Sequence, residues 1–395
     1  MSLLHQLSLH CVFSAATQDS HAPADLIRSD SFNETVHDME TGSNSNELLV
    51  GYAKSLHEIL AASDKDVFHF GGSQLKLHPV LREMLAHAYI CGGVNGTRST
   101  ASIIVGCVRG GDPKSDATID MLRNLAISWV SHFLFVFKSS HSRFTQLSSE
   151  PSETATPSFE DTDTRLKVSS IAGNHRTGFR DDILKRDGYQ CIVTGFRDLA
   201  FLVAVAIFNR EDLDQYLSTL TTWDILRNFA QLTPANVEDL GKLIDAPPNG
   251  FLLQHDALNG FDRFAWCLEK TEVENRYTVN IFDEYKHSIF GLTKGQVKVV
   301  EFEDHSDEFR SDEERSSPLK RSLGVPLPDP HYISIHAAIA GVLHMSGAGK
   351  FLDELLDKFD SNGVGSSAVP SWEDLCGGVQ LADVRKGLAA SGLGA

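Results

Sequence analysis

Two polar stretches interrupt this chain of 395 residues and divide it into parts that must each find their own core. Residues 139–170 are dominated by Ser, Thr, Glu and Asp, a composition typical of flexible linkers. Residues 301–330 combine a run of acidic side chains with four prolines, which interrupt any helix. We therefore expect a flexible linker at 139–170, an acidic, proline-rich connector at 301–330, and folded parts on either side of each.

The part before the linker is predicted to be helical. In residues 47–138, apolar side chains recur at spacings of three and four, which places them on one face of successive helices. These stripes are typical of a small helical bundle, and burial in its own core is favoured over a docking surface. Residues 1–46 are polar and lack this periodicity, so we expect them to form a disordered arm.

The part after the connector is predicted to be a helical tail at residues 331–360. It contains apolar segments on both sides of a Gly-rich turn, and His336 and His344 fall on the first of them. We interpret both histidines as packed side chains rather than ligands. Residues 361–395 are rich in Gly and Ser and are expected to be disordered.

The net charge of −18 counts against broad contact with nucleic acid, because contacts to phosphates supply most of that affinity. One short segment departs from this balance, because its basic residues outnumber its acidic ones. The basic residues are Arg176, Arg180, Lys185 and Arg186. They could form a small nucleic-acid-binding surface, and an ordinary solvated helix face is an equal alternative.

Nothing in the sequence predicts a membrane segment. The apolar stretch at Leu3–Ala16 is interrupted by polar residues and lacks a positively charged leader, so no signal peptide is expected. The six cysteines show no CxxC spacing, which argues against a zinc site built from cysteines and favours reduced thiols. These features predict an intracellular protein of the cytoplasm or nucleus, with no membrane partner.

A segment with several more specific features begins after the linker. Residues 179–195 read FRDDILKRDGYQCIVTG, which predicts a short amphipathic helix, a turn at Asp187-Gly188 and a β-rich run at 189–193. Further features follow in order: an apolar run at 201–208 that fits a buried strand, helical spacing at 223–229, Pro248-Asn249-Gly250 before apolar residues, a short helix ending at Phe261-Asp262, and a β-like run at 264–268.

This order of motifs resembles the HNH nuclease family, in particular the HNH-domain proteins abundant in fungi, over residues 175–285. The resemblance implies an α+β chain whose central domain, residues 171–300, contains a ββα module that holds one divalent metal ion, Mg²⁺ or Mn²⁺. In such a module, a histidine on the first strand acts as general base toward water, and an asparagine orients that base. A histidine on the helix ligates the metal, which stabilises charge on the phosphate being cut.

The asparagine of the family pattern corresponds to Asn249, for which a simple Pro-Asn-Gly turn is the alternative interpretation. The position of the first histidine corresponds to Val205 or Ala206, depending on register. Neither side chain can accept a proton or bind a metal. The loss of a general base typically lowers the rate about a hundredfold to ten-thousandfold.

The second histidine position corresponds to Leu258, and His255 lies one turn earlier in the same predicted helix. Because residues three apart share a helix face, His255 could replace the missing ligand, aided by Asp256 or Asp262. The resemblance therefore implies Asn249 and His255 as candidate catalytic residues, and His255 and Asp262 as candidate metal ligands. The alternative is that His255 is an exposed polar residue without such a role.

Three functions are compatible with this sequence. The first is a metal-dependent nuclease of the HNH type, impaired in catalysis, with the divalent metal as its cofactor. The second is a catalytically inactive HNH-like module that binds nucleic acid or a protein partner. The third is an interaction protein whose helical flanks do the binding. The substituted histidine positions favour the second and the third.

Overall fold

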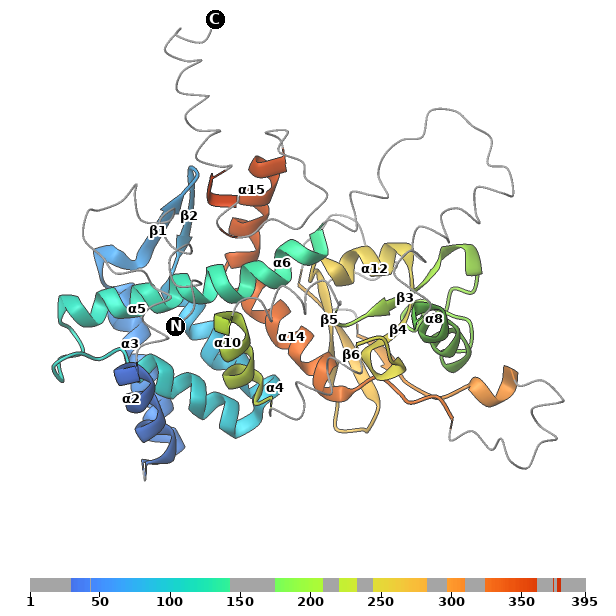
Figure 1. The fold of residues 1–395 in the computed structure, drawn as a ribbon, viewed down its shortest axis with the longest axis horizontal. Coiled ribbons are helices and arrows are strands. Elements are labelled where there is room, and N and C mark those ends of the chain that lie inside the picture. Colours follow the sequence, from blue (N-terminus) through green and yellow to red (C-terminus); the bar gives the residue numbers. More distant parts are fainter. Residues whose placement is uncertain are drawn as a thin grey trace, which may run out of the picture. The chain divides into compact units, whose positions relative to one another are not determined.

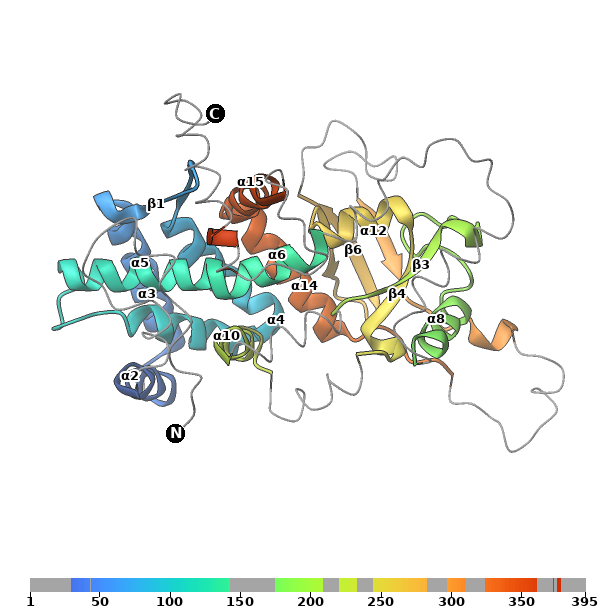
Figure 2. The same cartoon turned by 45° about the horizontal axis from the view of Figure 1, so that its top comes forward.

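The computed structural model describes the following residues: 30–42, 44–142, 175–208, 220–232, 244–282, 297–309, 324–360, 372 and 375–377. They form two compact units. Unit 1 comprises the described parts of 1–140, 214–232 and 341–395, and unit 2 comprises those of 141–213 and 233–340. Helices occur together with small antiparallel sheets, so the described chain is an α+β protein, as expected (Figures 1 and 2). None of the described helices has the length and apolar character that a membrane-spanning segment needs.

Unit 1 is predominantly helical. Its elements include α2 (Asp30–Thr41), α3 (Asn46–Ala61), α4 (His78–Val105), α5 (Asp116–Trp129), the π-helical turn η3 (Val130–Leu134), most of α6 (Phe135–Ser142), α10 (Leu220–Ala230) and α15 (Ala348–Asp360). The side chains of Ser45 and Ser115 accept hydrogen bonds from backbone N–H groups at the starts of α3 and α5. The apolar stripes meet in a core that includes Leu56, Trp129 and Phe133.

Helices α4 and α10 pack closely against each other. A Cβ atom added at Gly96 would lie 2.7 Å from the carbonyl oxygen of Phe229, so only glycine allows this approach. Helix α4 also contains a kink at Gly93, whose φ of 58° lies in the left-handed region. The expected domain at 171–300 included the residues of α10, but the structure places this helix in unit 1.

Unit 1 also contains a β-hairpin that the helical prediction for 47–138 missed. Its strands are β1 (Val67–Phe70) and β2 (Ser73–Lys76), which pair antiparallel. Gly71 and Gly72 join them, both with positive φ. The Nζ atom of Lys358 donates hydrogen bonds to the carbonyl oxygen of Gly71 (2.6 Å) and to Oγ of Ser73 (2.8 Å). Strands of four residues are too short to show a clear period in a sequence.

The expectation of a disordered arm at 1–46 does not hold for α2. The side chains of Phe32 and Val36, one turn apart, are both buried. The guanidinium group of Arg98 donates hydrogen bonds to four carbonyl oxygens at the C-terminal end of α2, those of Met39, Glu40, Gly42 and Asn44. One apolar pair among polar residues is a weak signal for a helix in a sequence. Contacts with residues distant in sequence stabilise α2 instead.

Unit 2 is built around two small antiparallel sheets. Its elements include α8 (His175–Arg186), β3 (Leu202–Ala206), β4 (Gly250–Gln254), α12 (His255–Asp262), β5 (Trp266–Lys270), β6 (Arg276–Ile281), β7 (Lys298–Glu301) and the 3-10 turn η6 (Ser306–Phe309). One sheet has the order β3-β4 and the other β5-β6-β7. Large aromatic side chains, among them Phe251, Phe264 and Trp266, fill the core of this unit.

Helix α14 (Pro330–Met345) continues the chain from unit 2 into unit 1. In unit 2, the imidazole ring of His336 stacks on Phe261, with 3.7 Å between ring centroids, and on Phe264, with 4.7 Å. Its Nε2 atom lies 3.2 Å from the carbonyl oxygen of Phe261. The interpretation of His336 as a packed side chain is confirmed, and His344 is half-buried.

The remaining expected boundaries are those of the linker, the acidic connector and the C-terminal tail. The linker expected at 139–170 lies outside the described residues beyond residue 142, as does most of the tail at 361–395. Within that tail, Trp372 is buried against Phe70 and Phe135. The first residues of the expected connector at 301–330 belong to β7 and η6 and contribute the buried Phe302. They are therefore part of the unit 2 core rather than a simple connector.

Candidate functional site

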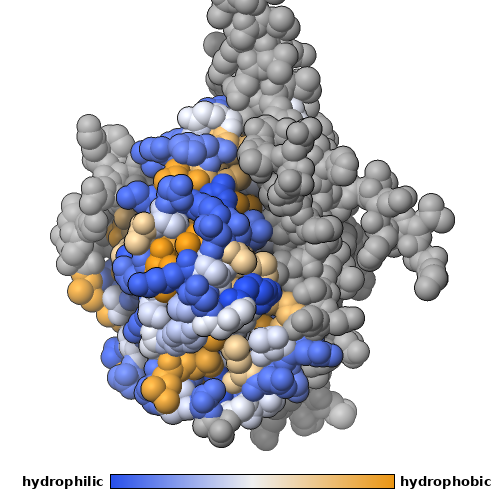
Figure 3. All heavy atoms as spheres, turned by 90° about the vertical axis from the view of Figure 1, so that its left-hand side faces the viewer, coloured by the Kyte–Doolittle hydropathy of each residue, from blue (hydrophilic) through white to orange (hydrophobic). Residues whose placement is uncertain are grey.

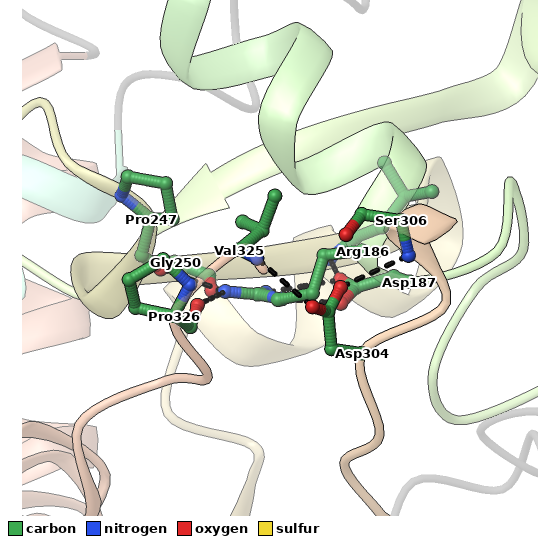
Figure 4. Close-up of polar contacts among 9 residues, drawn as sticks. Arg186, Asp187, Pro247, Gly250, Asp304, Ser306, Val325 and Pro326 are labelled. Carbon is green, nitrogen blue, oxygen red and sulfur yellow. Dashed lines mark hydrogen bonds and ion pairs between the residues drawn. The ribbon is translucent and has the colours of Figure 1, made fainter. Parts of the chain in front are cut away.

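A fully buried arginine holds together the segments around the candidate site. The guanidinium group carries five N–H donors, and Arg186 uses all of them within unit 2 (Figure 4). Nε and one Nη2 hydrogen reach the two carboxylate oxygens of Asp187, at 2.7 and 3.2 Å. The other bonds go to the carbonyl oxygens of Pro247 (2.8 Å), Gly250 (2.7 Å) and Pro326 (3.0 Å). Arg186 therefore has no donor left for a phosphate, which corrects its expected role in binding nucleic acid.

The carboxylate of Asp187 extends the same network to strand β4. Its Oδ2 atom accepts a hydrogen bond from the backbone N–H of Leu252 at 2.7 Å. Burial raises the pKa of Asp187, although the charge of Arg186 and these hydrogen bonds act in the opposite direction. The ion pair thus fixes the end of α8 to the middle of β4 from inside the unit.

A second carboxylate, that of Asp304, ties the chain after β7 to the same network (Figure 4). It accepts hydrogen bonds from the backbone N–H groups of Ser306 and Val325, both at 2.9 Å. Burial alone would raise the pKa of Asp304, but these hydrogen bonds and the charge of Arg186 lower it overall. The carboxylate of Asp304 is itself exposed, and it joins segments far apart in the sequence beside the buried pair of Arg186 and Asp187.

The segment at 191–195 forms a turn rather than the predicted β-rich run. The N–H of Gly195 donates to the carbonyl oxygen of Cys191 at 2.8 Å, and Gly195 has a φ of 72°. The N–H of Cys191 donates in turn to the carbonyl oxygen of Phe196 at 2.8 Å. A bond of 3.0 Å from the N–H of Ile192 to the carbonyl oxygen of Leu252 attaches this turn to β4.

The antiparallel pair of β3 and β4 is followed directly by helix α12. Val205 pairs with Phe251 and Ala206 pairs with Gly250. A Cβ atom added at Gly250 would lie 2.3 Å from the carbonyl oxygen of Val205, so the strands can approach only because this residue is glycine. The predicted strand at 201–208 and the predicted short helix ending at Phe261-Asp262 are thereby adjacent to β4 in space as well as in order.

Asn249 clamps the chain that leaves β3. Its side chain is fully buried, and its Nδ2 atom donates to the carbonyl oxygens of Phe208 (2.7 Å) and Ile244 (2.8 Å). Its Oδ1 atom accepts from the N–H of Phe208 at 3.0 Å, and its own carbonyl oxygen accepts from the N–H of Ile207 at 2.8 Å. A plain Pro-Asn-Gly turn would not need these contacts, so Asn249 fixes backbone geometry beside the end of β3.

The two positions considered for the first histidine differ in accessibility. Val205 is 5 % exposed, whereas Ala206, the last residue of β3, is half-buried. A general base must reach a water molecule at the surface of the substrate, so Ala206 is the position at which a longer side chain could act. A methyl group stands there, and it can neither accept a proton nor bind a metal.

Helix α12 does not bring the two candidate ligands together. His255, its first residue, is exposed, while Leu258 and its last residue, Asp262, are buried. His255 and Asp262 are separated by about 10 Å along the helix axis, at 1.5 Å per residue. Metal–ligand bonds span only about 2.0 to 2.6 Å, so this pair does not fit a single ion. Within the described ranges, no three His, Cys, Asp or Glu side chains lie close enough to hold a metal.

The basic cluster on α8 is smaller than the sequence suggested. Arg180 and Lys185 are half-buried, and the exposed Asp181 and Asp182 lie beside them. The side chain of Arg176 lies outside the described part of the structure. Arg180 and Lys185 therefore remain as candidates for contact with phosphate.

Sequence reasoning missed the polar centre around Arg186 and Asp187. Its only local sign was Asp187-Gly188, which correctly indicated the end of a helix but not a buried ion pair.

Comparison of this chain with protein-family models, with curated proteins and with solved structures finds no match.

Proposed function

We propose that unit 2 contains an HNH-type ββα module, made of β3, β4 and α12, whose catalytic side chains have been replaced, so that the module binds nucleic acid rather than cleaving it. One observation carries the proposal: Asn249 holds the backbone of Phe208 beside the end of β3. In an HNH site the asparagine of this position orients the general base. Here the residue at the end of the strand is Ala206, so the clamp is present and the group it would orient is missing.

The chemistry of phosphodiester hydrolysis explains why we expect binding without cleavage. A general base must take a proton from the attacking water, and Ala206 cannot do so. The helix position that would supply the metal-ligating histidine is Leu258, a buried hydrocarbon side chain. Both positions therefore lack reactive atoms, although the antiparallel pair of β3 and β4 and the helix α12 that follows it are present.

A second candidate function is cleavage that uses His255 in place of the lost base. The observation in its favour is the exposure of His255 at the first residue of α12, where its imidazole is accessible to a substrate. Two observations weaken this candidate function. Asp262 is buried, and it lies about 10 Å from His255 along the axis of α12, so the two side chains do not converge on one ion.

Restoring the two histidines tests both candidates. We expect the wild-type chain to nick supercoiled plasmid DNA no faster than the Asn249→Ala variant, with either Mg²⁺ or Mn²⁺. The double variant Ala206→His/Leu258→His should nick at least about tenfold faster, because a general base alone contributes a hundredfold or more. The single variant Leu258→His is the matched control and should stay near the wild-type rate.

Two results would contradict the proposal. If the wild-type chain nicks DNA and His255→Ala abolishes the activity, the second candidate is correct. If the folded double variant remains inactive, Ala206 and Leu258 do not occupy the positions that the proposal assigns to them.

A further inference from the structure

Large apolar side chains are exposed in the segment at 195–201, which leads into β3 and in which every residue is exposed. Phe196 is 41 % exposed, Leu199 49 % and Phe201 56 %. The rings of the two phenylalanines lie edge to face, with 6.3 Å between their centroids and an interplanar angle of 72°. Single exposed apolar residues are ordinary on a protein surface, whereas a contiguous patch indicates a binding surface. We call Phe196, Leu199 and Phe201 the aromatic platform.

Hydrogen bonds fix the backbone of the aromatic platform. The carbonyl oxygen of Phe196 accepts from the N–H of Cys191 at 2.8 Å, and the N–H of Phe201 donates to the carbonyl oxygen of Asp198 at 3.0 Å. The carboxylate of Asp198 accepts from the N–H of Ala200, also at 3.0 Å, at the start of a 3-10 turn directly before β3. The platform is therefore formed before any ligand arrives, which lowers the entropic cost of binding.

A cationic side chain accompanies the two rings. The guanidinium group of Arg197 donates from Nε and Nη2 to Oε1 of Gln190, at 3.3 and 3.2 Å. Gln190 is neutral, and Arg197 makes no ion pair among the residues that the structure describes. The neighbouring carboxylate of Asp198 is used as an acceptor by the turn. A guanidinium group in this position can bind a phosphate with its remaining N–H groups, or stack on a base.

The chemistry of the aromatic platform fits an unpaired base better than a duplex. Bases in a duplex are stacked on one another, whereas a base of a single strand can lie on an aromatic side chain. Stacking needs no cation, so it suits a chain with a net charge of −18, which can make few phosphate contacts. The platform carries no hydrogen-bonding group apart from Arg197, so it offers little to distinguish the 2′-hydroxyl of RNA.

We propose that the aromatic platform stacks bases of single-stranded DNA, with Arg197 at a phosphate, so that unit 2 binds a single strand more tightly than a duplex. This inference rests on the proposed function, because the platform leads into β3 of the proposed HNH-type module, and it names the class of nucleic acid that the module binds. A second copy of the chain and another protein are the alternative occupants of this surface.

Fluorescence anisotropy of the full chain with labelled oligothymidine, and with its duplex with oligodeoxyadenosine, tests the proposal at about 50 mM salt. We expect the single strand to bind at least about fivefold more tightly than the duplex, the effect of stacking one base. Phe196→Ala and Phe201→Ala should each weaken single-strand binding by at least about fivefold and leave duplex binding unchanged. An RNA oligouridine should bind no more tightly than oligothymidine.

Variants that keep or remove the aromatic ring distinguish stacking from a general apolar contact. Phe201→Trp should keep the affinity for the single strand, while Phe201→Leu should lose as much as Phe201→Ala, because leucine is apolar but has no ring on which a base can stack. Val273→Ala is the control, since Val273 is an exposed apolar residue elsewhere in unit 2, and it should bind as the wild-type chain does.

The failure of this inference can be told apart from the failure of the proposed function. If the duplex binds but the single strand binds no better, or if Phe201→Ala leaves single-strand binding unchanged, the inference is overturned and the proposed function stands. If neither nucleic acid binds, both are overturned. The inference is also overturned if Phe201→Leu keeps the affinity, if the RNA binds more tightly, or if sedimentation shows a dimer that Phe201→Ala dissociates.

Discussion

Arg180 and Arg186 stand on the same helix, and their different surroundings show what decides the role of a single residue. Arg180 is half-buried, whereas Arg186 is fully buried and donates all its N–H groups to a carboxylate and to carbonyl oxygens. Burying a charge is costly unless it is paired and hydrogen-bonded, and here both conditions are met. The guanidinium of Arg186 is therefore a structural group, while Arg180 is only half-buried and makes no such network among the described residues.

Arg186→Met should destabilise unit 2 strongly. The change would leave the carboxylate of Asp187 buried without its counter-charge and remove the donors to Pro247, Gly250 and Pro326, so we expect a loss of about 3 to 5 kcal/mol in the free energy of unfolding. Urea denaturation would measure this loss. Arg180→Met, on the same helix, should change the free energy by less than about 0.5 kcal/mol. Equal effects of the two variants would show that the buried network contributes little.

At the scale of elements, the pairing of β3 with β4 determines where the candidate site lies. The strands are joined by a long excursion of the chain, and a glycine at the start of β4 permits their approach. Asn249 precedes that glycine and clamps the end of β3. Helix α12 then follows β4 without a linker, which places Leu258 and His255 on the element next to the hairpin.

Gly250→Ala should disturb this hairpin. The added methyl group would meet the carbonyl oxygen of Val205 and the ring of Phe179, and a paired backbone carbonyl cannot move aside cheaply. We expect a loss of about 1 to 3 kcal/mol, typical of overpacking, measured by thermal denaturation. Gly178→Ala in α8 is the control, because nothing lies within 4 Å of its added Cβ and alanine favours helix. A Gly250→Ala variant as stable as Gly178→Ala would contradict the close approach.

At the scale of the whole molecule, a net charge of −18 limits how this chain can meet nucleic acid. One face of the molecule shows hydrophilic residues around smaller hydrophobic areas (Figure 3). With Arg186 buried, the described basic residues of α8 that can reach a phosphate are Arg180 and Lys185. If unit 2 binds nucleic acid as proposed, so few phosphate contacts should give a low affinity, and this affinity should decrease as the salt concentration rises.

Retention on duplex DNA should therefore be detectable at about 50 mM salt and largely lost at about 200 mM. Lys185→Met should reduce the slope of log affinity against log salt by about one, the effect of removing one phosphate contact. Fluorescence anisotropy with a labelled duplex would measure both. Lys270→Met, which removes the same charge elsewhere in unit 2, is the control. If Lys185→Met leaves this slope unchanged, Lys185 does not contact a phosphate.

Local patterns in the sequence anticipated many of the elements. Apolar spacings predicted α3, α5 and the first half of α4, the run at 201–208 predicted β3, and the packed His336 followed from its place on an apolar helix. These properties depend on neighbours within a few turns of the chain, which a single sequence contains.

Only the tertiary structure decided the burial of Arg186, the turn at 191–195, the helix α2 and the assignment of α10 to unit 1. Each depends on partners distant in sequence: Arg186 on the carbonyl oxygens of Pro247 and Pro326, and α10 on the glycines of α4. A buried ion pair and an exposed one use the same residue types, and their difference lies in the surrounding protein. The sequence alone therefore determined which elements form, while long-range contacts determined which charges remain available for function.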